Sequence, residues 1–210
     1  IVKDELSKKG IEPAYSAGLS LGEYAAIAEC GAMSFQDAVH TVYERGRLMA
    51  EAVPEGVGAM AAVLNPDEAI LNEVLSETEG AYVANYNSPA QIVITGYKEA
   101  VEEAASKLQQ RGIKRCVMLN VSGPFHSPLL KEAGEKLSEV LRDVELKPLS
   151  HPYYANIDAG LVTDTEDIKD KLVRQVSGSV HFRQIIEAMI EDGVDTFIEI
   201  GPGRTLCGFI

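Results

Sequence analysis

The stretch PAYSAGLSLGEYAAIAECG, residues 13–31, changes character in its middle. Residues 13–19 are small and mostly apolar, as in a short strand, whereas residues 23–31 have the pattern of a helix that ends at Gly31. Ser20 stands between them in the spacing G-x-S-x-G. A strand, a tight turn and a helix in this order are typical of α/β proteins. We therefore predict an α/β fold with Ser20 at a strand-to-helix corner.

A serine at such a corner is a candidate nucleophile. The sharp turn lifts its hydroxyl off the sheet, and we expect Gly18 and Gly22 to relieve the crowding there. The N-terminus of the helix directs free N–H groups at the same place, where an oxyanion would form. The N–H of Leu21 is the natural first donor. The alternative is a small residue in a tight turn, and the pattern by itself leaves both open.

The chain after this corner predicts a second helix and then a separate unit. Ser34 caps a helix over residues 34–52, with Asp37 in a capping-box position. Its apolar residues follow the helical period: Phe35, Ala38, Val39, Val42, Tyr43 and Met49. Residues 56–121 then predict the order β-α-β-β-α-β of a ferredoxin-like domain, with strands at 58–64, 81–87, 91–96 and 113–121.

The flanking segments form the larger part of the predicted fold. We expect residues 1–55 and 122–210 to form one discontinuous α/β core, with residues 56–121 inserted as the small domain. Residues 152–157 and 194–201 predict strands of the parallel core sheet. Ser127 and Pro128 predict the start of a helix, and residues 167–180 and 182–193 predict two more.

Composition narrows the function classes. The chain has 210 residues, 46% of them hydrophobic, and a formal charge of −13, which argues against nucleic-acid binding. The exception is a small basic patch of Arg111, Lys114 and Arg115, for which a solvated loop end is the plainer interpretation. No apolar run has the length of a membrane span, and the first residues do not resemble a signal peptide, so we expect a cytoplasmic protein away from membranes. The histidines and cysteines show no metal-ligand spacing, so no metal is predicted.

A serine nucleophile needs a base, and His126 is the best candidate among the four histidines. It stands in GPFHSP, just before a predicted helix N-terminus, whose positive end would keep the imidazole neutral. His40 and His181 lie in or beside helical stretches, and His151 lies in a polar loop. A loop histidine that caps backbone groups is the alternative.

Arginines supply a third candidate group. Arg45 and Arg47 project from opposite margins of the second helix, so one of them could reach a site while the other meets solvent. An esterase of the α/β-hydrolase class would need an acid between Ser20 and His126 at the end of a strand. The acids in that interval fall in predicted helices, which disfavours an esterase.

Six motifs in series resemble the malonyl-CoA:acyl-carrier-protein transacylases, the acyltransferases of bacterial type II fatty acid synthesis. They run along essentially the whole chain: GLSLGEY (18–24), ERGRLMAEAVPEGVGAMAAV (44–63), NYNSPAQIVITG (85–96), VSGPFHSPLL (121–130), LVRQVSGSVHF (172–182) and EIGPGRTL (199–206). The resemblance implies an α/β-hydrolase-like core with a ferredoxin-like insert. It also implies an [acyl-carrier-protein] S-malonyltransferase that takes malonyl-CoA as substrate and acyl carrier protein as partner. Such an enzyme would be a monomer without a permanently bound cofactor.

The resemblance also implies roles for residues. Ser20 would be the nucleophile, His126 its base, and Arg45 the group that holds the malonyl carboxylate. Gln175 would orient the histidine through its main-chain carbonyl, and the N–H of Leu21 would be one oxyanion donor. Phe125 and Leu21 match the family residues associated with malonyl units.

Two departures from the family pattern keep alternatives open. Leu19 stands where the family has histidine before the nucleophile, and neither the N-terminal G-Q-G segment nor the C-terminal tail is found in the chain. We expect the sequence to be part of a longer protein. The remaining alternatives are an acyltransferase domain of a polyketide or fatty-acid megasynthase, a non-catalytic acyltransferase-like binding module, and the esterase.

Overall fold

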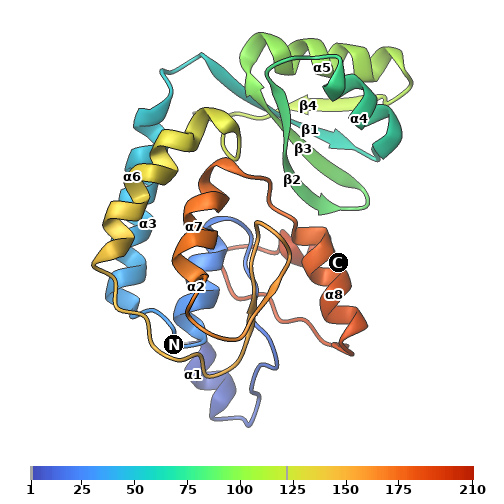
Figure 1. The fold of residues 1–210 in the computed structure, drawn as a ribbon. Helices are drawn as coiled ribbons and strands as arrows, with labels where there is room; N and C mark the ends of the chain where they lie inside the picture. Colours follow the sequence, from blue (N-terminus) through green and yellow to red (C-terminus); the bar gives the residue numbers. More distant parts are fainter. Residues whose placement is uncertain (1, 122) are drawn as a thin grey trace.

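The computed structural model describes residues 2–121 and 123–210 and has mixed α/β architecture. Figure 1 shows a sheet with two helices at one end and a mainly helical body below it. Within the described ranges, none of the helices combines the length and the apolar character needed to cross a bilayer.

The predicted order β-α-β-β-α-β over residues 56–121 is present. Strand β1 (Gly58–Leu64) pairs antiparallel with both β3 (Gln91–Tyr97) and β4 (Arg115–Met118), and β2 (Ala81–Ser88) pairs antiparallel with β3. The sheet order is β2-β3-β1-β4. Helices α4 (Glu68–Ser76) and α5 (Lys98–Gln110) share a buried apolar cluster with this sheet, including Val63, Leu71 and Leu108. The unit therefore has a core of its own.

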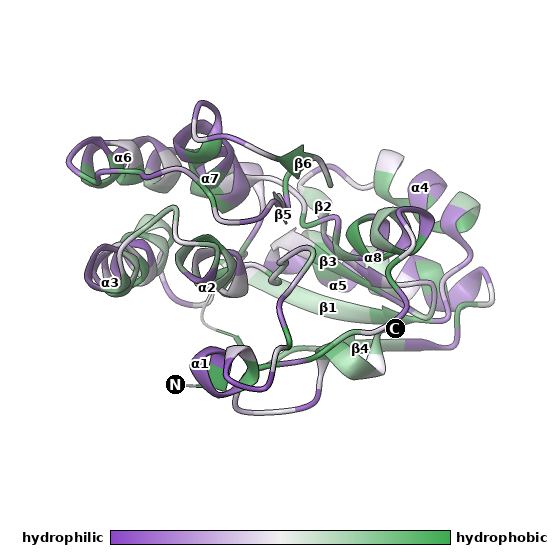
Figure 2. Cartoon of the chain, turned by 90° about the horizontal axis from the view of Figure 1, so that it is seen from below, coloured by the Kyte–Doolittle hydropathy of each residue, from purple (hydrophilic) through white to green (hydrophobic). Residues whose placement is uncertain are grey.

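The helical body has a second apolar core. Helices α2 (Leu21–Glu29), α3 (Phe35–Ala52), α6 (Lys131–Arg142) and α7 (Ile168–Ser177) contribute to it, and α3, α6 and α7 lie side by side (Figure 1 and Figure 2). A 3₁₀ turn, η1 (Pro128–Leu130), precedes α6. The remaining elements are α1 (Val2–Ser7), α8 (Phe182–Glu191) and η2 (Leu206–Gly208). The predicted helices are thus confirmed in order, but the one predicted over residues 167–180 ends at Ser177, and the one predicted from Pro128 begins with the 3₁₀ turn.

Helix α3 is capped as predicted, but its apolar stripe is only partly buried. The Ser34 side chain accepts a hydrogen bond from the Asp37 N–H, which satisfies one of the free donors of the first turn. Ala38 and Met49 are buried, whereas Phe35, Val39 and Tyr43 are exposed. The helical period of these residues therefore does not place all of them in the core. The three exposed residues are spaced four apart, on a face that the neighbouring helices do not cover.

The strands predicted for the main sheet are reduced or absent in the described part of the chain. Within residues 152–157 only β5 (Tyr153–Tyr154) forms, and it pairs antiparallel with β6 (Leu161–Val162). Residues 13–19 contribute one parallel bridge, Ser16 to Tyr153, and residues 194–201 form no strand. A strand is defined by a ladder of backbone bonds, and here the parallel ladder stops after the bonds from Ser16 N and Tyr154 N. In the described residues, the predicted parallel core sheet is thus reduced to this one parallel bridge.

Backbone hydrogen bonds join the two bodies beside the edge strand β2. The Tyr86 N–H donates to Val180 O at 2.8 Å, and the Val180 N–H donates to Ala84 O at 2.8 Å. Val180 follows directly after α7, so β2 is held against the segment between α7 and α8. Phe125 packs against apolar clusters of both bodies. Phe125, the residue before His126, therefore lies between the apolar cores of the two bodies.

Candidate active site

Ser20 occupies a strained corner at the N-terminus of α2. Its φ of 55° lies in the left-handed region, which non-glycine residues rarely adopt and which costs about 1–3 kcal/mol. A Cβ on Gly18 would come within 2.0 Å of the Gly22 carbonyl carbon, so only glycine fits at position 18. A Cβ on Gly22 would meet open space, so the expected need for a second glycine was wrong in steric terms. The Ser20 hydroxyl makes no capping bond and is free for chemistry.

The predicted base lies against this hydroxyl. His126 Nε2 is 2.7 Å from Ser20 Oγ, and His126 Nδ1 is 2.8 Å from the main-chain oxygen of Gln175. A carbonyl oxygen only accepts, so Nδ1 carries the proton and Nε2 presents its lone pair to the serine. Gln175 can offer this carbonyl because it lies in the last turn of α7, where carbonyls have no intrahelical partner.

The environment keeps His126 neutral, as predicted, but for a different main reason. Burial and, to a smaller extent, the positive charge of Arg45 lower the pKa of His126 to about 4. The predicted cause was instead the positive end of the following helix. A neutral imidazole at this place can accept a proton over the whole physiological pH range.

The structure distinguishes the two candidate arginines. Arg45 is 6% exposed, and its Nη2 donates to Ser20 Oγ at 2.9 Å and to Gln175 Oε1 at 3.0 Å. Its Nε is buried and has no hydrogen-bond partner among the described residues. Arg47 is instead on the surface, where it forms ion pairs with Glu44 and Glu51. Only Arg45 belongs to the site.

Leu21 begins α2, and its N–H points from the first turn of the helix, where no acceptor is available one turn earlier. This N–H follows the serine directly and is therefore placed as an oxyanion donor would be. The Leu21 side chain is 55% exposed and takes no part in a core. The five predicted residues thus converge on one place from separate elements. Ser20 and Leu21 stand at the start of α2, Arg45 on α3, His126 in the loop before η1, and Gln175 on α7.

A cavity of about 380 Å³ leads to His126 from between the two bodies. Tyr82, Val83 and Tyr86 of β2 line one side, and Ser179, after α7, lines another. This opening combines apolar walls with the imidazole of the site, as is typical of pockets for organic ligands.

The other sequence candidates make no contact with the Ser20 hydroxyl among the described residues. His40 is exposed on α3, and His181 stacks on Tyr86 with ring centroids 5.2 Å apart. Arg111 of the small basic patch forms ion pairs with Glu73 and Glu77, so that it is a structural residue of the small unit.

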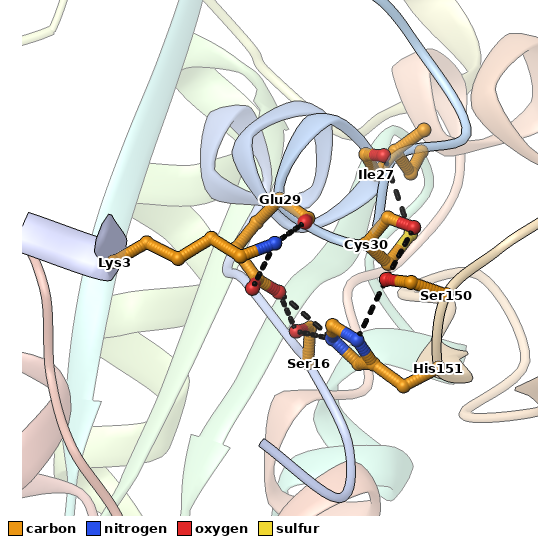
Figure 3. Close-up of polar contacts among 7 residues, drawn as sticks. All are labelled: Lys3, Ser16, Ile27, Glu29, Cys30, Ser150 and His151. Atoms are coloured by element: carbon orange, nitrogen blue, oxygen red, sulfur yellow. Dashed lines mark hydrogen bonds and ion pairs between the residues drawn. The ribbon is translucent and has the colours of Figure 1, made fainter. Parts of the chain in front are cut away.

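A second cluster of serine, histidine and acid lies near the other end of α2. Figure 3 shows Ser16, Glu29 and His151 in mutual contact, with Lys3 on Glu29 and Ser150 on the far side of the imidazole. His151 Nε2 is 2.8 Å from Ser16 Oγ and 2.9 Å from Glu29 Oε2. Both neighbours share one nitrogen, which differs from the arrangement around His126.

Two buried polar residues of the site were missed by the sequence analysis. Glu23 and Asn156 are both completely buried, and Asn156 Oδ1 accepts a hydrogen bond from the Ser20 N–H at 2.6 Å. Glu23 is part of the quoted GLSLGEY motif, so its place three residues after the serine was an available signal. Asn156 stands in a predicted strand far along the chain, where nothing local indicates the contact.

Comparison with known proteins agrees with this geometry. The profile of the acyl transferase domain family matches residues 2–208. A malonyl CoA-acyl carrier protein transacylase from Bacillus subtilis (strain 168) is 47% identical over 213 residues, which cover 100% of this chain and 67% of the relative.

Solved structures show the same relation. The crystal structure of MCAT from Streptococcus pneumoniae aligns with a TM-score of 0.93 at 44% identity, covering 99% of this chain and 69% of that one. A malonyl transacylase in complex with its type II polyketide acyl carrier protein aligns with a TM-score of 0.95 at 39% identity, again covering 99% and 69%. The chain therefore belongs to the acyl transferase domain family, among the malonyl CoA-acyl carrier protein transacylases.

Proposed function

We propose that this chain transfers a malonyl group from coenzyme A to the phosphopantetheine thiol of acyl carrier protein through a malonyl ester on Ser20. The observation that carries the proposal is the pair of contacts on His126, 2.7 Å from Nε2 to Ser20 Oγ and 2.8 Å from Nδ1 to Gln175 O. This arrangement leaves the serine hydroxyl facing a fixed, neutral base.

The reaction then runs in two matching halves. His126 Nε2 takes the proton of Ser20 as Oγ attacks the thioester carbonyl, and the Leu21 N–H stabilises the negative charge that forms on the carbonyl oxygen. The carbon–sulfur bond breaks, coenzyme A leaves as a thiol with the proton from His126, and the malonyl ester remains. The carrier-protein thiol gives its proton to His126, attacks the ester, and Ser20 recovers its proton as it leaves.

Arg45 supplies selectivity for an acyl group that ends in a carboxylate. Its buried Nε–H lacks an acceptor among the described residues, and its Nη2 already lies 2.9 Å from the nucleophile. A malonyl carboxylate beside the ester would accept from this guanidinium, whereas an acetyl group would leave the buried donor unsatisfied.

The two bodies have different parts in this proposal. We assign residues 1–55 and 122–210 to an α/β-hydrolase-like core that carries the five residues Ser20, Leu21, Arg45, His126 and Gln175, and residues 56–121 to a ferredoxin-like insert. The sheet order β2-β3-β1-β4 and the separate apolar core support the second assignment. Strand β2 lines the cavity at His126, which would then hold the pantetheine arm common to both thiol substrates.

Mass spectrometry of the protein mixed with malonyl-CoA tests the proposal. We expect a mass increase of one malonyl group on the peptide that contains Ser20, and loss of that mass on addition of acyl carrier protein with its phosphopantetheine arm. Transfer to the carrier thiol, rather than release of malonate, separates the transferase from an esterase. A label on any other residue would overturn the assignment of the nucleophile.

A further inference from the structure

A carboxylate that the reaction scheme does not use lies directly beneath the site. Glu23 is in the first turn of α2 and is completely buried. Burial of an acid is unfavourable unless hydrogen bonds or charges compensate for the lost water. We therefore expect the buried Glu23 carboxylate to have a role that offsets the cost of its burial.

Two hydrogen bonds reach Glu23, both on the same oxygen. Oε2 accepts from Gln175 Nε2 at 2.7 Å and from the Asn156 N–H at 3.1 Å. Oε1 is buried and has no partner among the described residues. The contacts of Glu23 are thus concentrated on two residues, one from α7 and one from the segment after β5.

Each of these two residues holds a different part of the reacting group. Asn156 Oδ1 accepts from the Ser20 N–H at 2.6 Å, and its Nδ2 donates to Gly18 O at 2.7 Å, so that it spans the corner from both sides. Gln175 Nε2 also donates to Ser20 O at 2.9 Å, while its Oε1 accepts from Arg45 and its main-chain oxygen accepts from His126.

We infer that Glu23 is a positioning residue, whose ionised carboxylate fixes Gln175 and Asn156 and through them sets the serine, the histidine and the arginine at their working distances. The inference rests on the proposed function, and it concerns a residue that touches none of the reacting atoms.

The charge state of Glu23 gives this role a pH dependence. Burial raises the pKa of Glu23 to about 7, against the opposing effects of the Gln175 and Asn156 hydrogen bonds and of Arg45. A proton on Oε2 would compete with both donors, and a proton on Oε1 would weaken Oε2 as an acceptor. The ionisable groups that influence or face Glu23 from the neighbouring elements are Arg45, Asp158, Tyr24 and Tyr153.

The rate of Ser20 acylation should fall as the pH is lowered. Above pH 7 Glu23 is ionised and both hydrogen bonds are strong, whereas below pH 7 it takes up a proton and they weaken. Because the pKa of His126 is about 4, the base itself stays neutral through this range. The fall in the rate of Ser20 acylation on the acid side is therefore set by Glu23 near pH 7, three pH units above the titration of the base.

The test is the pH dependence of Ser20 acylation by malonyl-CoA, measured by rapid quench from pH 4.5 to 9, in the wild type and in Glu23→Gln. We expect the wild-type rate to fall below pH 7. Glutamine keeps an acceptor but cannot titrate, so the variant should be slower by about 10- to 100-fold at pH 8, as for a small misplacement of reacting groups. Its rate should stay flat down to about pH 5.

Glu29→Gln is the matched control, because it makes the same substitution in the same helix on a carboxylate whose polar partners in the described part of the chain are Lys3, Ser16 and His151. It should keep both the rate and the fall near pH 7. A Glu23→Gln profile that still falls near pH 7 would overturn the inference. If that variant does not fold, the wild type decides, since a rate that is flat down to pH 5 excludes Glu23 as the titrating group. Failure of the wild type to label at all would instead reject the proposed function.

Discussion

Two serine–histidine clusters lie near opposite ends of α2, and they differ in how the imidazole is used. At the N-terminal end, Ser20 and a main-chain carbonyl contact different nitrogens of His126. Near the C-terminal end, Ser16 and Glu29 contact the same nitrogen of His151, while Nδ1 faces Ser150 Oγ. Ser150 itself donates to Cys30 O, so both nitrogens of His151 face acceptors.

The comparison shows that a serine, a histidine and an acid in contact do not by themselves make a nucleophile. At His151 the Ser16 hydroxyl donates to the Glu29 carboxylate, so its proton is not directed at the imidazole. His151 therefore joins α2 to the segments that hold Ser16 and Ser150, as Figure 3 shows, whereas His126 presents a lone pair to Ser20.

The largest difference is expected between the two serines. Ser20→Ala removes the oxygen that lies against His126 Nε2, and malonyl labelling from malonyl-CoA should disappear. Ser16→Ala should label at the wild-type level. Intact-protein mass spectrometry of both variants measures this, and a labelled Ser20→Ala protein would contradict the assignment.

The two histidines should differ almost as much. His126→Ala removes a general base, which contributes about 10²–10⁴-fold to such reactions, so the acylation rate should fall by that factor. His151→Ala should change the acylation rate less than about twofold, because it acts only through packing and polar contacts remote from the site. Single-turnover kinetics on folded protein compare them; an equal loss in both variants would remove the distinction.

The two arginines extend the comparison to substrate selection. Arg45→Ala removes a charged hydrogen-bond donor worth about 1.5–3 kcal/mol, so malonyl transfer should fall by about 10- to 100-fold relative to acetyl transfer. Arg47→Ala removes a surface residue and should leave the malonyl-to-acetyl ratio unchanged. The ratio of kcat/KM for the two acyl-CoA substrates is the measurement. A parallel loss of both activities in Arg45→Ala would argue against carboxylate recognition.

The smallest effect is expected on stability, in the cluster of Figure 3. Burial acts to raise the pKa of Glu29, but hydrogen bonds from Ser16 and Lys3 and the charge of His151 outweigh it and lower the pKa below 4.5. The ionised form therefore stabilises the fold above pH 4.5, and this contribution is lost as the pH falls below that value. Glu29→Gln should lower the free energy of unfolding at pH 7 by less than about 1 kcal/mol, with a smaller difference at pH 4. Urea unfolding at both pH values tests the sign.

Much of the molecule follows from local sequence. The alternation of strand and helix patterns over residues 56–121 predicted every element of the small unit, because each strand finds its partner inside that unit. Ser34 with Asp37 predicted the start of α3, since a cap is a contact over three residues. Ser20 and His126 could be singled out by the turn and loop in which they stand.

The rest depends on contacts between distant segments. The sequence could not choose between Arg45 and Arg47, because the choice depends on which margin of α3 faces Gln175, 130 residues away. The carbonyl role of Gln175 came only from resemblance, since every residue has such a carbonyl. Phe35, Val39 and Tyr43 followed the helical period and yet lie exposed, because periodicity identifies an apolar face but not a neighbour to cover it.

The acceptor that holds His126 belongs to the main chain of residue 175, and this affects how the site responds to mutation. In a site oriented by an acidic side chain, one nucleotide change can delete the acceptor. Here every replacement at position 175 retains a carbonyl, and the imidazole loses its anchor only when the last turn of α7 moves. Substitutions that break this contact should therefore lie among the residues that pack against α7. Such variants should lose activity because the packing of the helix, and with it the folded structure, is disturbed.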